Sequence, residues 1–165
     1  MAEPSALQRG FIGAMLSPLK FRLYTLRSIP VAAFIGTRVR SLTLEECSTT
    51  VPFRWSSTNP FRSTYFAALN ATAELSTGIL AMAHLYPHRQ DVAMLMVDCS
   101  AEFLKKATDL TTFTSTDGSQ VRSVIERAIA TGEAGTCTMT TVGRNETGDI
   151  VARMNFTWSF KKRAR

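Results

Sequence analysis

Residues 65–85 constrain the fold of this chain most, because they form a long run dominated by Ala, Leu, Met and Ile. A helix that is apolar around most of its circumference has to be buried, either in a protein core or in a membrane. The run is too polar for a lone membrane span, since it contains Asn70, Thr72, Glu74, Ser76, Thr77 and His84. We therefore expect a buried central helix, capped by the hydroxyl of Ser63 or Thr64 and ended by Pro87.

Strand patterns lie on both sides of this helix. Six segments are rich in β-branched and aromatic residues or alternate in polarity, namely 38–44, 46–55, 92–103, 107–116, 134–142 and 149–160. A hairpin turn over 144–148 joins the last two. Residues 118–131 are predicted as a short helix or as part of a longer connection. The order of elements indicates an α+β fold with one antiparallel sheet and the helices segregated from it.

Two of these strands carry alternations that assign side chains to faces. In the segment 46–55, one face is predicted to hold Thr49, Val51, Phe53 and Trp55. In the segment 92–103, one face is predicted to hold Ala93, Leu95, Val97, Cys99, Ala101 and Phe103. Pro52 suggests an edge position or a bulge in the first of the two.

The N-terminal segment reads as helical. Residues 5–27 have apolar side chains at helical spacing, as one helix or as two divided at Pro18, and residues 31–36 are apolar up to Gly36. A length of 165 residues fits a single domain. We interpret residues 1–36 as a helical cover on the outside of the sheet and residues 37–165 as the main domain.

Composition narrows the classes of function. The net charge of +6, concentrated partly in the tail 161–165, favours an anionic partner: nucleic acid, acidic lipid, or a phosphorylated small molecule such as coenzyme A. The alternative is a solvated tail that only keeps the protein soluble. No nucleic-acid-binding motif, P-loop or dinucleotide fingerprint accompanies this charge. Three scattered cysteines form neither a metal-ligand spacing nor a disulfide framework. We expect a cytoplasmic protein that uses no metal and binds neither nucleic acid nor membrane.

Glu74 is the residue of the central helix that burial explains least. An unpaired carboxylate costs several kcal/mol to bury, so a buried Glu74 should be paired, protonated or functional. Burial would raise its pKa and make it a better base near neutral pH. The alternative is a narrow polar stripe with Asn70 and Thr77, which lie at spacings of four and three residues.

The loop before the helix supplies the second candidate. Asn59 precedes Pro60, which alone indicates an ordinary turn. However, the loop leads into a helix N-terminus, where free backbone N–H groups near Tyr65 and Phe66 could bind an oxyanion or a polarised carbonyl.

These residues resemble a known signature. The run N-P-F-R-S-T-Y-F-A-A-L-N-A-T-A-E-L (59–75) is similar to that of hot-dog acyl-CoA thioesterases of the phenylacetyl-CoA type. In that family an Asn, a five-residue gap, His-Gly-Gly and an acidic residue on the central helix recur. Asn59 and Glu74 fall on the Asn and acidic positions. The stretch E-F-L-K-K-A (102–107) resembles the family's entry into the next strand, and the resemblance spans about residues 37–161.

The resemblance implies a hot-dog fold, in which an antiparallel sheet wraps a long central helix, here with an extra N-terminal helical segment. It also implies hydrolysis of an acyl-CoA or similar thioester, with Glu74 as base or nucleophile and Asn59 positioning water or substrate. Coenzyme A would be part of the substrate, with no other cofactor. Further candidates for the oxyanion or substrate are Tyr65, Phe66, Asn70 and Thr77, and for the coenzyme A phosphates Lys105, Lys106 and Arg122.

The family's sites lie at a homodimer interface, so the resemblance implies a homodimer, possibly one that pairs further into a tetramer. Tyr65, Phe66 and Ala67 stand where the family has His-Gly-Gly. A glycine pair lets the backbone approach the thioester carbonyl closely. The replacement leaves open a second function, in which a non-catalytic hot-dog protein binds an acyl-CoA or another apolar ligand.

Overall fold

Proline and glycine divide the N-terminal segment into three helices in the computed structural model, which describes residues 3–163. Helix α1 (Ala6–Leu16) begins at a capping box in which Ser5 and Gln8 bond each other's backbone N–H groups. Pro18 and Pro30 each occupy the first position of a helix, α2 (Pro18–Ser28) and α3 (Pro30–Ile35). Gly36 then ends α3 in the left-handed region, at φ 82°. The prediction of two helices divided at Pro18 is therefore confirmed.

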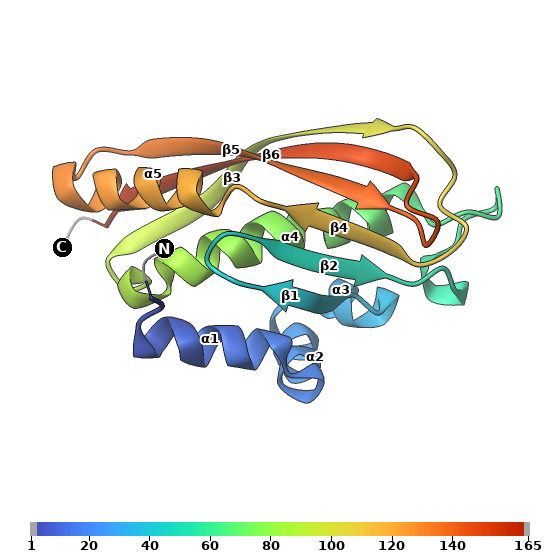
Figure 1. The fold of residues 1–165 in the computed structure, drawn as a ribbon, viewed down its shortest axis with the longest axis horizontal. Coiled ribbons are helices and arrows are strands. Elements are labelled where there is room, and N and C mark those ends of the chain that lie inside the picture. The colour runs from blue at the N-terminus through green and yellow to red at the C-terminus, as the bar shows by residue number, and fades with distance from the viewer. Residues whose placement is uncertain (1–2, 164–165) are drawn as a thin grey trace.

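The strands form a six-stranded antiparallel sheet in the order β1-β2-β4-β5-β6-β3 (Figure 1). Their bounds are β1 Arg38–Leu42, β2 Cys47–Val51, β3 Val92–Phe103, β4 Thr111–Ser115, β5 Gly135–Arg144 and β6 Ile150–Lys162. Helix α5 (Gly118–Thr131) connects β4 to β5, which settles residues 118–131 as a helix. β3 and β1 are the edge strands, and β3 pairs with β6 alone.

The central helix α4 (Phe66–Leu85) packs on the inner face of this sheet, with fourteen buried residues. The inner face of β6 meets it with Ala152, Met154, Phe156, Trp158 and Phe160, each buried, as the alternation predicts. The predicted cap is wrong, because Tyr65 is the N-cap and makes no side-chain bond. Ser63 and Thr64 instead lie in the segment before the helix, where the Thr64 N–H donates to the Ala107 carbonyl.

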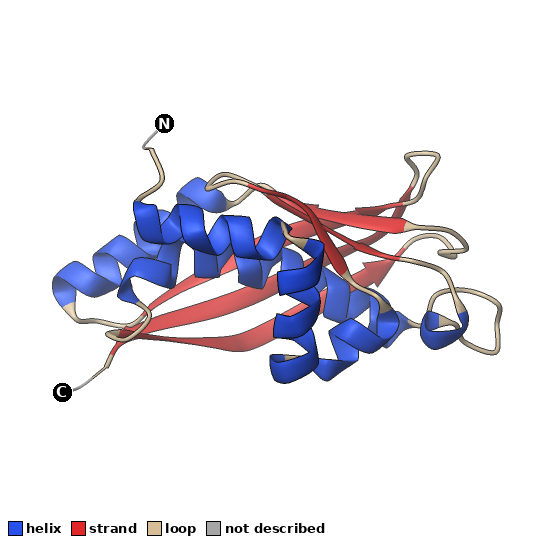
Figure 2. Cartoon of the chain, turned by 90° about the horizontal axis from the view of Figure 1, so that it is seen from below, coloured by secondary structure: helices blue, strands red, loops and turns tan. Residues whose placement is uncertain are grey.

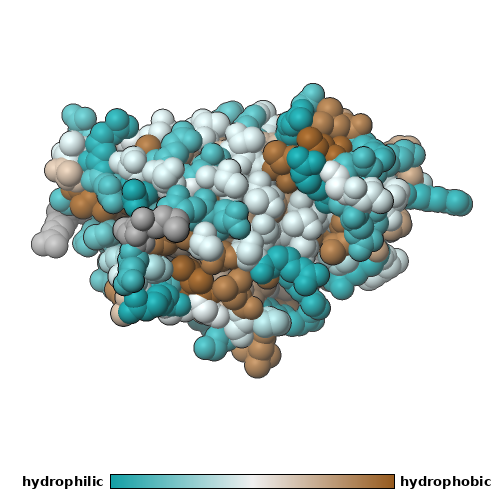
Figure 3. All heavy atoms as spheres, in the orientation of Figure 1, coloured by the Kyte–Doolittle hydropathy of each residue, from teal (hydrophilic) through white to brown (hydrophobic). Residues whose placement is uncertain are grey.

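The sequence suggested that the N-terminal helices cover the outside of the sheet. In the structure they do not. Helix α1 contacts β1 and α4, α2 contacts β1, and α3 contacts α4. All the helices therefore lie on the inner side of the sheet or along its β1 edge (Figure 2). The outer face stays exposed and polar at Thr136, Thr138, Thr140, Arg153 and Asn155. Figure 3 shows it from the side of β2 and β4, where white and teal side chains predominate.

Two strand predictions need correction. β2 ends at Val51, and Trp55 begins a short 3-10 helix (Trp55–Ser57) in which its side chain is 83 % exposed. In β3 a bulge leaves Val97 without a partner, since Met96 pairs with Trp158 and Asp98 with Thr157. One extra residue reverses the alternation. Cys99, Ala101 and Phe103 therefore face the inner side, whereas Ala93 and Leu95 face the outer side.

Helix Phe66–His88 is long and apolar enough to cross a membrane, yet 67 % of its apolar window is buried inside the fold. Its apolar surface is covered by the sheet and the neighbouring helices, as in the core helix of a soluble protein. The pattern of residues 65–85 is thus explained by burial in the protein core.

Candidate active site

Glu74 lies two turns into α4 on a stripe that the sheet and the other helices cover incompletely. Its side chain is half-buried, as are Asn70 and Ala71 on the preceding turn. The carboxylate has no hydrogen-bond or salt-bridge partner among residues 3–163. Burial raises its pKa to about 7, because a desolvated carboxylate is less stable than the neutral acid. Glu74 therefore exists as a mixture of carboxylate and acid near neutral pH, the property that a general base needs.

Gly78 lies beside the Glu74 carboxylate, and the charge of Glu74 acts on Tyr24. A Cβ on Gly78 would lie 3.1 Å from Glu74 Oε1 and 3.2 Å from the Trp158 ring, so this glycine leaves room for both side chains. On α2, burial and then the charge of Glu74 raise the pKa of the Tyr24 phenol. The N-terminal helices thus contribute a polar group within electrostatic range of the candidate base. No local pattern indicates this, since the two residues lie fifty positions apart.

Thr77 does not share the stripe of Glu74. It is fully buried, and its Oγ1 accepts from Trp158 Nε1 at 3.0 Å and donates to the Glu74 carbonyl at 2.9 Å. Both of these bonds lie inside the core between α4 and β6, so the hydroxyl is not accessible to a substrate. Of the predicted polar stripe, Asn70 and Glu74 remain.

The start of α4 forms a second polar centre. The N–H groups of Phe66 and Ala67 have no acceptor within residues 3–163, and Tyr65 provides no side-chain cap. An open cavity of about 350 Å³ lies here, and Asn59, Thr64 and Phe66 contribute to its wall. Thr64 is 4 % exposed, and its Oγ1 is buried without a partner. Free donors at a helix N-terminus next to an unsatisfied hydroxyl make a site that suits an oxyanion.

Asn59 lines this cavity but is engaged within its own loop. Its Oδ1 accepts from Phe61 N at 2.9 Å and from Ser63 N at 3.3 Å, and its Nδ2 lies 3.2 Å from Ser63 Oγ. These bonds form the turn that the sequence Asn-Pro predicts. Asn59 therefore shapes the loop at the rim of the cavity.

Aromatic rings crowd the entrance. Phe66 is 57 % exposed and packs edge-on against Tyr65, with ring centroids 4.8 Å apart, and against Phe103 at 6.4 Å. Phe103 belongs to the inner face of β3. The residues that replace a glycine pair in the resemblance thus build an apolar wall between the α4 N-terminus and the edge strand.

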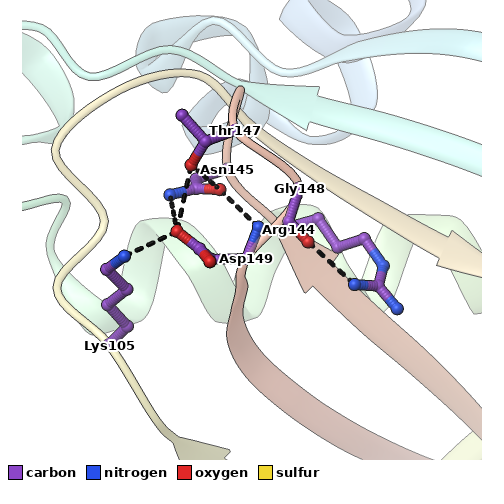
Figure 4. A network of polar contacts seen from close by, with 6 residues as sticks. All are labelled: Lys105, Arg144, Asn145, Thr147, Gly148 and Asp149. Carbon is purple, nitrogen blue, oxygen red and sulfur yellow. Dashed lines mark hydrogen bonds and ion pairs between the residues drawn. The ribbon is translucent and has the colours of Figure 1, made fainter.

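The lysines and the arginine that are predicted to bind phosphate lie at two different cavities. Lys105 and Lys106 line the cavity at the start of α4, but Lys105 Nζ is paired with Asp149 Oδ2 at 2.6 Å. Asp149 belongs to the β5–β6 turn, where Asn145 and Thr147 also bond it (Figure 4). These contacts hold the pKa of Asp149 at about 2. Arg122 lies on α5, 3.9 Å from Glu126, in a different cavity.

The two polar centres are separated within one chain. Glu74 follows Phe66 by eight positions, which corresponds to about 12 Å along a helix. Glu74 does not line the cavity at the α4 N-terminus. A single chain therefore holds a candidate base and a candidate oxyanion site, but it does not bring them to one carbonyl. Within residues 3–163 no group of three His, Cys, Asp or Glu side chains could hold a metal ion.

Comparison with known proteins agrees with this architecture. The model of a family described as a domain of unknown function (DUF4442) matches residues 20–160. No curated protein matches the sequence. A solved protein of unknown function from Pseudomonas aeruginosa, described as a probable thioesterase, superposes with a TM-score of 0.75 at 19 % identity, over 92 % of this chain and 100 % of its own.

Two further solved structures are described as thioesterases. One from Haemophilus influenzae gives a TM-score of 0.65 at 14 % identity, over 88 % of this chain and 91 % of its own. A mutant thioesterase from Pseudomonas aeruginosa gives 0.67 at 15 % identity, over 89 % and 95 %. These likenesses identify the fold as the hot-dog fold of thioesterase-like proteins, as the sequence resemblance implies.

Proposed function

We propose a function from the premise that this chain belongs to the DUF4442 family and has the hot-dog fold of thioesterase-like proteins: it hydrolyses a thioester of the acyl-CoA kind. The observation that carries the proposal is Glu74, a half-buried carboxylate without a partner whose pKa is raised to about 7. Keeping such a group in a core helix costs stability, which is typical of a functional residue.

Glu74 would act on water. Its carboxylate takes a proton from a water molecule while the oxygen of that water adds to the thioester carbonyl. The tetrahedral intermediate then expels the thiolate, and the proton on Glu74 passes to the departing sulfur. Direct attack by Glu74, with an anhydride then hydrolysed by water, is the second route that the same position allows.

The start of α4 would stabilise the negative charge on the carbonyl oxygen. Phe66 and Ala67 each carry a free backbone N–H, and the positive end of the helix dipole adds to them. Thr64 lines the same cavity, and its hydroxyl is buried there without a partner. Lys106 is the nearby cation for a coenzyme A phosphate, whereas Lys105 is neutralised by Asp149.

The enzyme would be a homodimer, because one chain keeps its base and its oxyanion donors about 12 Å apart. The edge strand β3 exposes Leu95, Met96, Val97 and Phe103, and a long apolar edge is a surface that proteins normally cover. Antiparallel pairing of two β3 strands would lay the two α4 helices side by side in opposite directions. Glu74 of one chain would then approach the α4 N-terminus of the other. We place this dimer in the cytoplasm.

Turnover of an acyl-CoA panel tests the proposal. We expect wild-type protein to release free coenzyme A, which a thiol reagent detects. The kcat of Glu74→Gln should be at least 100-fold lower. The matched control is Glu133→Gln, which neutralises an exposed carboxylate on the loop after α5. Equal turnover by Glu74→Gln and wild type would remove Glu74 from the mechanism.

Phe66 supports a second function, binding of an acyl-CoA or another apolar ligand without hydrolysis. Its exposed ring stands beside the N–H groups that an oxyanion would use. If the ring blocks the carbonyl, acyl-CoA binds with unchanged affinity to wild type and Glu74→Gln, and neither releases coenzyme A. Calorimetry with a non-hydrolysable thioether analogue measures the affinity, and coenzyme A release by wild type distinguishes the two functions.

A further inference from the structure

A cavity that Glu74 does not line is situated between the N-terminal helices and the β1 edge of the sheet. It measures about 690 Å³, within the range of about 300–1,000 Å³ typical of small-molecule sites. Helices α1 and α2 contribute Met15, Leu16 and Phe21 to its wall, and β1 contributes Val39. The residues that α1 contributes to this wall are apolar, and α2 lies beside β1 (Figure 1).

Four arginines complete the wall of this cavity: Arg22, Arg38, Arg40 and Arg54. They come from α2, β1 and the segment after β2, so the fold gathers them from three separate elements. No Asp or Glu lines the cavity, and none of the four arginines has an ion-pair partner within residues 3–163. Four uncompensated positive charges repel one another, and an anion would relieve that repulsion.

Arg54 is held in place by the protein rather than left mobile. Its Nη2 donates to the Phe34 carbonyl at 2.8 Å and its Nε to Ser56 Oγ at 2.9 Å. Gly36, at φ 82°, gives the guanidinium its room, because a Cβ there would collide with it. Nη1 keeps no protein acceptor among the described residues. A fixed guanidinium with free donors is preorganised for a carboxylate or a phosphate.

Two threonines of the wall, Thr25 and Thr37, are already satisfied. The Thr25 hydroxyl donates to the Phe21 carbonyl at 3.0 Å, and Thr37 Oγ1 lies 2.8 Å from Thr72 Oγ1. The free hydrogen-bonding capacity is therefore mainly that of the arginines, with the Thr50 hydroxyl beside them, and the other side chains of the wall are mostly apolar. A polyanion such as nucleic acid would not use the aliphatic part, and a bare inorganic anion would leave it hydrated.

We propose that this cavity binds an anionic amphiphile: an apolar chain that carries a carboxylate or a phosphate head. The head lies among Arg38, Arg40 and Arg54, and the chain lies against the α1 and α2 side chains. The site is separate from Glu74 and does not depend on the proposed hydrolysis.

Calorimetry with the full chain tests this site, using decanoate and decyl phosphate below their micelle concentrations. We expect both probes to bind, and the double variant Arg38→Gln/Arg40→Gln to bind each at least tenfold more weakly. The control Arg127→Gln/Arg153→Gln removes the same charge from exposed positions on α5 and β6, and it should bind like wild type. A preference for one probe identifies the head as carboxylate or phosphate.

Three results would overturn the proposal: equal loss in both double variants, inorganic phosphate binding as tightly as decyl phosphate, or neutral decanol binding as tightly as decanoate. Binding only to anionic lipid vesicles, with no monomeric probe bound, would also overturn it in favour of a membrane surface. Should the β1 variant unfold, as judged by circular dichroism, Arg54→Gln removes a head contact outside the sheet and provides the same comparison, with Arg153→Gln as its control.

Discussion

The indole Nε1 of Trp158 donates a 3.0 Å hydrogen bond to Thr77 Oγ1, and this bond joins β6 to the central helix next to Glu74. Thr77 in turn donates to the Glu74 carbonyl, and the Trp158 ring lies against Gly78. The backbone that carries the candidate base is therefore fixed from the sheet side. The Glu74 side chain itself lies on the stripe of α4 that is incompletely covered.

Thr77→Val should destabilise the protein by about 1–3 kcal/mol, because it leaves the buried indole N–H of Trp158 without an acceptor. Urea unfolding measures this change. Thr138→Val is the control, since Thr138 bonds Thr157 on the exposed outer face and should change stability by less than about 0.5 kcal/mol. Equal effects of the two substitutions would show that the Trp158 bond contributes nothing.

The raised pKa of Glu74 predicts how stability depends on pH. Its pKa is about 7 in the folded protein and 4.5 when unperturbed, so between these values the folded state binds more protons at this site. Stability contributed by the neutral acid is thus complete below pH 4.5 and is lost as pH rises through 7. Relative to wild type, Glu74→Gln should gain roughly 2–3 kcal/mol between pH 5 and pH 8.

Unfolding free energies at the two pH values test this linkage, with Glu133→Gln as the control that should show no such gain. A constant difference between Glu74→Gln and wild type would mean that the Glu74 pKa is the same in the folded and unfolded states. The same titration predicts that the rate of thioester hydrolysis rises with pH to a plateau, with a midpoint near 7.

Local patterns predict the parts of the fold that depend on local chemistry. The central helix follows from a long run dominated by apolar residues, and β6 follows from its alternation through Phe156 and Trp158. The bulge at Val97 has no such signal, because pairing with β6 decides it. The end of β2 at Val51 is marked by Pro52, but a proline alone does not distinguish a strand end from an edge position or a bulge. The sequence predicts the wrong position for the N-terminal helices, because an apolar helix face does not specify the surface that it covers.

The candidate site divides in the same way. Glu74 could be identified from sequence, since a lone carboxylate in an apolar helix conflicts with burial. The ion pair that Lys105 forms with Asp149 could not be identified from sequence, because the two residues lie 44 positions apart. The unsatisfied Thr64 hydroxyl and the convergence of Arg22, Arg38 and Arg54 likewise exist only in three dimensions.

Two glycines should respond to alanine in opposite directions. A Cβ on Gly143 in β5 would press into the buried ring of Phe113, so Gly143→Ala should destabilise by about 1–3 kcal/mol. Gly13 is exposed within α1 and has no atom within 4 Å of a Cβ, so Gly13→Ala should stabilise by about 0.5–1 kcal/mol. Thermal unfolding of both variants measures the two signs, and a shared sign would contradict the packing around Phe113.

The β3 edge provides the last prediction, the dependence of activity on a dimer. The double variant Leu95→Lys/Val97→Lys places two charges on the exposed edge strand, where like charges from two copies would face each other. We expect wild type to have about twice the chain mass of 18.2 kDa in light scattering, and this variant to have the single mass. Because the base and the oxyanion donors lie about 12 Å apart in one chain, the monomer should lose thioesterase activity while keeping its circular dichroism spectrum.

Thr136→Lys/Thr138→Lys is the matched control, since it adds the same charges to the exposed outer face of β5, away from the edge. It should remain a dimer with wild-type activity. An active monomer would contradict the shared site, because Glu74 would then have to meet a thioester carbonyl without a second chain. A dimer that survives both substitutions would move the interface away from β3, and the apolar side chains of that edge would need another partner.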